Sequence, residues 1–209
     1  GFVPAEYKSA TDVVTYVKDN FGSTAAQRRQ LEFLMLLFKR LNELKERLDN
    51  EVIDKEEFEL YIQRFLDNIK HEQFREKSLA FRNALINIAT DRKLNNFEVE
   101  YFVNSLIGFS DLHFAIISYF NNPKEYLEKK GFASNSLKSQ SGGEERILQK
   151  LFEDVDFELI KLASKELKDK GFTEIQIPFG GGLTSMNAYE RLTKDYLTHM
   201  GKKFISFFL

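Results

Sequence analysis

The three prolines of this 209-residue chain stand at positions 4, 123 and 178, so residues 5–122 contain none. A proline inside a helix removes one backbone hydrogen bond and clashes with the preceding turn, so a stretch without proline can form long helices. Within this stretch, apolar residues recur at spacings of three and four, which is the period of one helix face. The positions of the prolines therefore predict a helical N-terminal part and a differently organised C-terminal part.

Two long helices are predicted in the N-terminal part. The first begins after Ser23 or Thr24, because a hydroxyl at that place can accept a free backbone N–H. The second is expected to run without a break from about residue 55 to residue 89. Polar residues at 49–51 join the two helices into an antiparallel hairpin with a coiled-coil-like seam. The apolar stripe of the first helix consists of Leu31, Leu34, Phe38, Leu41 and Leu48, and that of the second includes Phe58, Ile62, Phe65, Ile69, Phe74, Phe81 and Leu85.

Shorter helices are predicted at residues 97–107, 112–120 and 124–130, and they are bounded by asparagine, serine, glycine or proline. Asn95 and Asn96 are expected to cap the first of them. Residues 1–131 are therefore expected to form one helical bundle. Residues 132–143 are small and polar, a composition typical of a flexible linker or mobile loop.

The remaining residues, 144–209, have a different pattern. Two helices are expected, at residues 144–152 and from Asp156 to Lys170, and a glycine follows the second. Alternating apolar residues at 175, 177 and 179 then predict a half-buried strand, three glycines turn the chain, and a final helix begins after Thr198. The fold class expected for the whole chain is mostly α: a helical bundle built on the long hairpin, and a small C-terminal module with a β-hairpin.

The order helix, helix, glycine, β-hairpin and closing helix is the order of a winged-helix module. Residues 167–172, Leu-Lys-Asp-Lys-Gly-Phe, look like the end of a recognition helix and the start of a wing. Residues 197–204 resemble the closing segment Leu-Thr-x-x-Gly-x-x-Phe of many bacterial helical proteins and regulators. Residues 144–209 thus resemble a winged-helix module of bacterial proteins, although they leave little room for the further helix that normally precedes the recognition helix.

The resemblance implies that residues 156–170 form a DNA-facing helix that enters the major groove. On that helix Lys161, Lys165 and Lys168 share one face, and Gly181 would lie in the wing. Charge argues against strong DNA binding, since the module contains 10 Lys and Arg against 11 Asp and Glu. The helix also has no arginine to make a bidentate contact with guanine. A DNA-binding transcriptional regulator is therefore an alternative to the leading expectation.

The chain has no cysteine, which excludes thiolate metal sites and a cysteine nucleophile, and it has 3 histidines. His71 opens the run His-Glu-Gln-Phe-Arg, in which Arg75 occupies the position where a zinc protease requires its second histidine. His113 lies in an apolar helix and is expected to be a half-buried structural residue, and His199 lies in the capping region of the last helix. The sequence therefore predicts no cofactor, no metal and no small-molecule ligand. An enzyme with an unrecognised site is the second alternative.

The leading expectation is a non-catalytic bacterial protein that acts through protein–protein contacts or self-association. The excess of lysine over arginine is what suggests a bacterial source. The longest apolar runs fall well short of the about 20 residues of a membrane-spanning helix, so we expect a cytoplasmic protein with no membrane partner. The expected interaction residues are Leu34, Phe38 and Leu41 on the helical hairpin, and Phe207 and Phe208 at the C-terminal end, which should pack in the core or against a partner.

Overall fold

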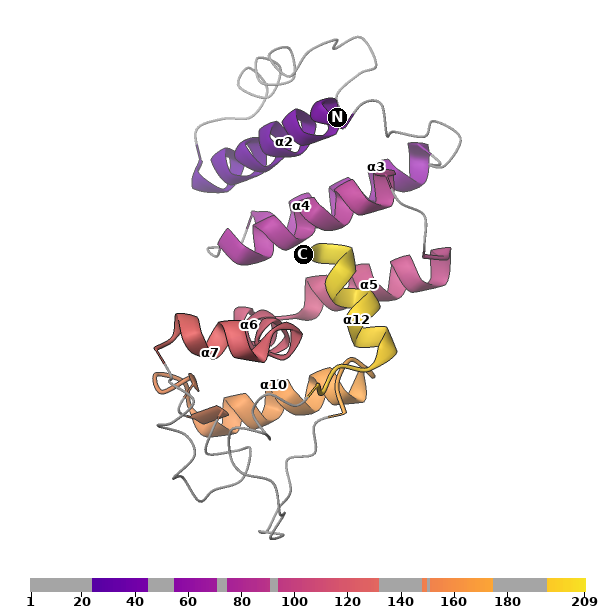
Figure 1. The fold of residues 1–209 in the computed structure, drawn as a ribbon. Helices are drawn as coiled ribbons and strands as arrows, with labels where there is room; N and C mark the ends of the chain where they lie inside the picture. The colour runs from indigo at the N-terminus through magenta and orange to yellow at the C-terminus, as the bar shows by residue number, and fades with distance from the viewer. Residues whose placement is uncertain are drawn as a thin grey trace, which may run out of the picture. The chain divides into compact units, whose positions relative to one another are not determined.

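The computed structural model of the chain describes residues 24–44, 55–70, 75–90, 94–131, 148–149, 151–174 and 195–209. Within these ranges the chain forms eight α-helices, and its β pairing is limited to one isolated antiparallel bridge between Thr173 and Leu197 (Figure 1). The predicted mostly-α class is confirmed. Most of the predicted β-hairpin falls on residues outside the described ranges, and no strand is found within them. No helix of the described part is both long and apolar enough to span a membrane.

The chain is divided into two compact units. The first comprises Gly1–Phe109 together with Phe207–Leu209, and the second comprises Ser110–Ser206. This division differs from the boundary predicted after residue 131. Because the predicted linker at residues 132–143 lies outside the described ranges, the three-part organisation stays a prediction.

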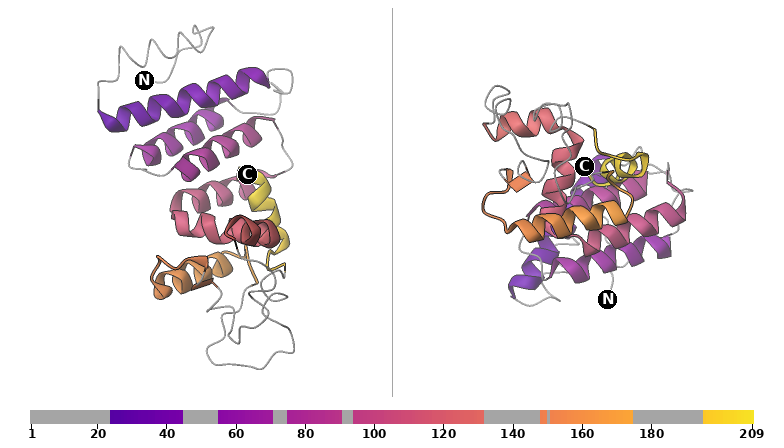
Figure 2. Two further views of the ribbon diagram at one scale, coloured as in Figure 1. Left: turned by 60° about the vertical axis from the view of Figure 1, so that its left-hand side comes forward. Right: turned by 90° about the horizontal axis from the view of Figure 1, so that it is seen from below.

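Helix α2, Ala25–Glu43, begins at a hydroxyl residue, as predicted. The Thr24 Oγ accepts the backbone N–H of Gln27 at 3.3 Å, and the Gln27 side chain accepts the backbone N–H of Thr24 at 3.2 Å. This reciprocal capping box satisfies two donors that the first turn leaves without a partner. The buried face of α2 consists of Phe33, Leu34, Leu37 and Leu41, and the helix packs against α3 (Lys55–Ile69) and α4 (Arg75–Thr90) (Figure 2).

The predicted unbroken helix from residue 55 to residue 89 is wrong, because this stretch contains two helices, α3 and α4. The apolar stripe changes phase between them: the step from Ile69 to Phe74 is five residues, where a continuous helix face requires three or four. A single straight helix would therefore turn the two halves of the stripe in different directions. The separate helices pack on each other instead, and the buried rings of Phe65 and Phe81 stack at 4.4 Å.

Helix α5, Asn96–Gly108, starts at a predicted cap and is joined to α3 by an ion pair. The Asn95 side chain accepts the backbone N–H of Glu98 at 2.9 Å. One Arg64 Nη donates to both carboxylate oxygens of Glu100, at 2.8 and 3.1 Å. The other Arg64 Nη donates to the Asn104 side-chain oxygen at 2.6 Å, so the guanidinium joins α3 to two residues of α5 that stand one turn apart.

The last residues of the chain pack into the first unit. Phe207 and Phe208 are buried, and the ring of Phe207 lies 5.5 Å from that of Phe102. The final carbonyls of a helix have no partner within the helix. Here the Asn87 amide donates to the Phe207 carbonyl at 2.9 Å, and the Asn83 amide donates to the Phe208 carbonyl at 3.1 Å. Two asparagines one turn apart on α4 therefore cap the C-terminal end of the last helix, α12 (His199–Phe208).

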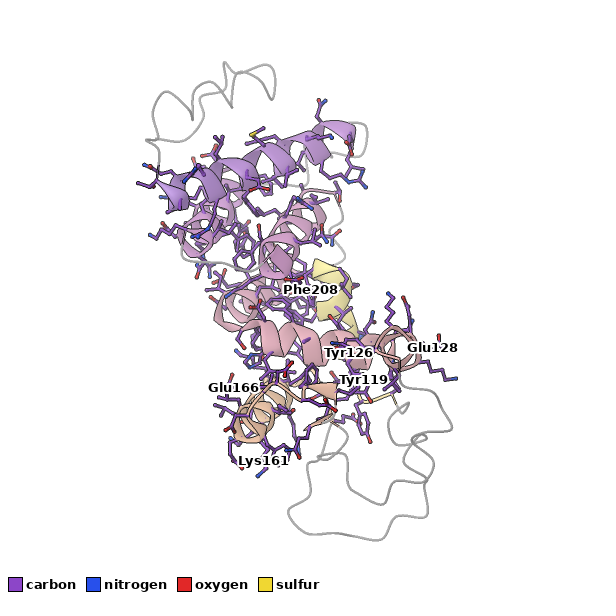
Figure 3. All side chains as sticks on the ribbon, turned by 90° about the vertical axis from the view of Figure 1, so that its left-hand side faces the viewer. Tyr119, Tyr126, Glu128, Lys161, Glu166 and Phe208 are labelled. Carbon is purple, nitrogen blue, oxygen red and sulfur yellow. The ribbon has the colours of Figure 1, made fainter. Side chains whose placement is uncertain are left out.

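The second unit is held together largely by aromatic contacts. The rings of Tyr119 and Tyr126 lie 5.5 Å apart (Figure 3), and those of Phe172 and Phe204 stack at 4.2 Å. The proline at position 123 starts a helix, a place where its missing N–H costs nothing. The helices of this unit are α6 (Asp111–Asn121), α7 (Pro123–Lys129), α10 (Phe157–Asp169) and α12 (His199–Phe208) up to Ser206.

Candidate functional site

Helix α10 is the helix that would face DNA if the winged-helix resemblance holds, and both of its ends are formed as expected. At its start the Asp156 carboxylate accepts the backbone N–H of Glu158 at 2.8 Å. At its end Gly171 has a φ of 71°, a conformation that favours glycine, and donates its N–H to the Lys168 carbonyl at 2.8 Å. The helix is thus a well-bounded surface of 13 residues.

Of the three lysines predicted as DNA contacts, Lys165 and Lys168 are exposed on α10, whereas Lys161 is half-buried, with its Nζ 4.8 Å from the centre of the Phe157 ring. Two are paired with acids of the same helix: Lys161 Nζ lies 2.9 Å from a Glu158 oxygen, and Lys165 Nζ lies 3.0 Å from an Asp169 oxygen. The carboxylates of Glu158 and Asp169 offset the positive charge of these lysines, which weakens the net electrostatic attraction that DNA binding requires.

Two leucines add an apolar element to the same side of α10. Leu159 and Leu162 are each 53% exposed and stand one turn apart. At 100° per residue both lie outside the buried stripe of the helix, with Leu162 about 60° from Lys165 and Leu159 a further 60° away from the lysines. Two neighbouring exposed leucines form a small apolar patch, which a single exposed leucine does not. The buried stripe consists of Ile160, Ala163, Ser164 and Leu167.

His113 is buried and connects α6 with α10. Its Nδ1 accepts the backbone N–H of Ser110 at 3.1 Å, and its Nε2 lies 2.8 Å from a Glu166 oxygen. Because a backbone N–H can only donate, the hydrogen of the neutral ring is on Nε2, which donates to the carboxylate. Figure 3 shows Glu166 and Lys161 on different sides of α10. The hydrogen bonds that link Ser110, His113 and Glu166 therefore cap α6 and hold α10 against it. This is a structural role for His113, like the one predicted.

The segment that resembles Leu-Thr-x-x-Gly-x-x-Phe attaches the start of α12 to the chain that follows α10. The Thr198 Oγ accepts the backbone N–H of Gly201 at 2.8 Å, and its hydroxyl donates to the Gly171 carbonyl at 2.5 Å. The Phe204 ring stacks on the Phe172 ring. The threonine, glycine and phenylalanine of the pattern thus each have a capping or packing role within the second unit.

Asp195, just before α12, gives a prediction about pH. The hydrogen bond from Lys202 Nζ, at 2.5 Å, lowers the pKa of Asp195 below its ordinary value, and the Leu197 N–H adds to this effect. A lowered folded-state pKa contributes stability above the unfolded pKa, and this contribution disappears as the pH falls through the folded value, below pH about 4. We expect Lys202→Met to raise the Asp195 pKa toward its ordinary value, as measured by carboxyl NMR titration. Lys203→Met should leave it unchanged, and equal shifts in both variants would contradict the assignment.

The predicted interaction residues lie inside the first unit. Leu34, Leu41, Phe207 and Phe208 are buried, and Phe38 is half-buried. The stripe that suggests a seam with a partner is the same stripe that packs α2 against α3 and α4. These side chains therefore contribute to the core of their own chain, and they do not form an exposed patch.

The described residues contain no group of three or more His, Asp or Glu side chains placed to hold a metal. Gly181, the predicted wing residue, lies outside the described ranges. No protein-family model, no curated protein and no solved structure matches the chain. The winged-helix resemblance of residues 144–209 therefore stays a prediction.

Proposed function

We propose that the chain is a non-catalytic protein-interaction protein and that it binds its partner through the solvent side of α10. The observation that carries this proposal is the exposed pair Leu159 and Leu162 beside paired charges. A mixed apolar and charge-compensated surface suits a protein partner better than a polyanion, because little net charge has to be neutralised.

The size of the patch indicates a weak or transient contact. Fully burying a leucine contributes about 1.5–3 kcal/mol, so covering the exposed half of each leucine contributes about 1 kcal/mol. A permanent interface covers a much larger area than one helix of 13 residues presents. The patch therefore supplies apolar anchors for an association that forms and separates readily.

A photo-crosslinking amino acid placed at Leu162 tests this proposal in the cells that make the protein. We expect covalent adducts with a protein from position 162 and none from position 60. Leu60 is a matched control, because it is a leucine 55% exposed on another helix, α3. Absence of adducts at position 162, or equal adducts at both positions, would contradict docking through α10.

The alternative function is a DNA-binding regulator of winged-helix type. It is favoured by the order α10, antiparallel bridge, α12, since Thr173 and Leu197 pair where the base of a wing would lie. This alternative requires affinity for duplex DNA that falls steeply with salt and is lost when Lys161, Lys165 and Lys168 are changed to Glu. Because three acids on α10 balance its three lysines, we expect no retention of DNA in mobility-shift assays at low salt. Salt-dependent retention that the triple variant abolishes would favour the regulator.

A further inference from the structure

We infer that the partner of the α10 surface is a second copy of this chain, with the two α10 helices packed antiparallel about a two-fold axis. This inference rests on the proposed function, and it names the partner. The basis of the inference is the spacing of charged and apolar residues along the solvent side of α10. This spacing makes the surfaces of two antiparallel copies complementary to each other.

The charged residues are arranged for reciprocal pairing. Glu158 and Lys165 are seven residues apart, so they lie on nearly the same side of α10, two turns from each other. In an antiparallel pair with the axis midway between them, Glu158 of each copy meets Lys165 of the other. The same contact thus forms twice, as a two-fold interface requires.

Both residues have room for a second partner. The side chain of Glu158 is 78% exposed and that of Lys165 is 73% exposed, although each already has an ion pair within its helix. Such exposed pairs within one helix are worth only a few tenths of a kcal/mol, so they do not hold the side chains in place. A carboxylate can also accept from two ammonium groups at once.

An apolar residue lies next to the same axis. Leu162 stands at the middle of the row between the two charges and about 50° from it around the helix, so it meets Leu162 of the other copy when the charges pair. Leu159 lies about 110° from the row, outside the contact between the two helices. The helix as a whole carries three lysines and three acids, so the two surfaces have no net repulsion. A partner whose charges are all of one sign could pair with Glu158 or with Lys165 but not with both. A second, antiparallel copy of α10 pairs with both residues.

Charge reversal provides a test that is specific to this geometry. Sedimentation of the unaltered chain is expected to show a monomer–dimer equilibrium at concentrations up to about 0.5 mM, a range suited to a small interface. Glu158→Lys and Lys165→Glu should each raise the dimer dissociation constant about tenfold or more. A mixture of these two variants should form heterodimers, and the double variant E158K/K165E should dimerise as the unaltered chain does. Leu162→Asp should abolish the dimer, whereas Leu60→Asp should leave it intact.

A monomer at every concentration would overturn the inference, as would a dimer that neither charge reversal weakens. The proposed function fails separately. If the unaltered chain is monomeric but position 162 still forms crosslinks to another protein, docking through α10 stands and only the second copy is wrong as the partner. If position 162 gives no crosslinks and no dimer is found, both proposals are wrong.

Discussion

Gly201→Ala is expected to destabilise the second unit by about 3 kcal/mol, a large cost for one added methyl group. The cause is lack of space, since Gly201 is not among the residues with positive φ. A Cβ at this position would collide with the carbonyl oxygen of Phe172, and it would also lie 3.3 Å from the Leu197 side chain. The carbonyl belongs to the backbone and is held by the Thr198 N–H at 3.1 Å, so it cannot move aside without breaking that hydrogen bond.

Gly108→Ala is the matched control for this prediction. Gly108 also lies in a helix, α5, and nothing is within 4 Å of the place where its Cβ would be. Alanine there should be neutral or stabilise by up to about 1 kcal/mol, because glycine loses more backbone entropy on folding. Urea unfolding followed by circular dichroism compares the two variants. Equal unfolding midpoints would show that α12 does not approach Phe172 so closely.

This close contact explains the sequence pattern without reference to DNA. In the run from Leu197 to Phe204, the glycine permits contact with the Phe172 backbone, the threonine caps α12 and the phenylalanine stacks on Phe172. All three roles serve the packing of one helix. A resemblance carried by these residues is therefore informative about fold and does not by itself indicate a nucleic-acid partner.

Local signals predicted the helix ends well. Thr24, Asn95 and Asp156 were expected to cap helices, and each accepts a backbone N–H from the first turn. Gly171 was expected to end α10, and it has the required positive φ. These features depend on a few neighbouring residues, which is why a single sequence is sufficient to locate them.

Features that depend on distant residues were not predictable in the same way. The stripe containing Leu34 and Leu41 has the same period whether it packs on its own chain or on a partner, so periodicity could not decide between core and interface. The pairing of His113 with Glu166 joins residues 53 positions apart in the sequence. The exposed leucines of α10 were predictable in part, because the phase of the buried stripe excludes positions 159 and 162.

Phe81→Ala is expected to destabilise the first unit by about 3–5 kcal/mol, and Phe65→Ala by a similar amount. Both rings are fully buried and stack at 4.4 Å with an interplanar angle of 14°, one from α3 and one from α4. Removing either ring leaves a cavity between these helices and exposes the other ring to it. The double variant should cost less than the sum of the single variants by about 0.5–1.5 kcal/mol, which is the coupling of a stacked pair.

Leu79→Ala supplies the comparison on the same helix, because this leucine is 44% exposed on α4 and should cost about 1 kcal/mol or less. Urea unfolding of the four variants and the unaltered chain completes the cycle. The result also separates the two arrangements of this stretch. In an unbroken helix, residues 65 and 81 would be more than four turns apart and could not touch, so their effects would add. Additive losses of unfolding free energy would therefore support a single long helix over residues 55–89. A coupling within the expected range requires α3 to fold back on α4.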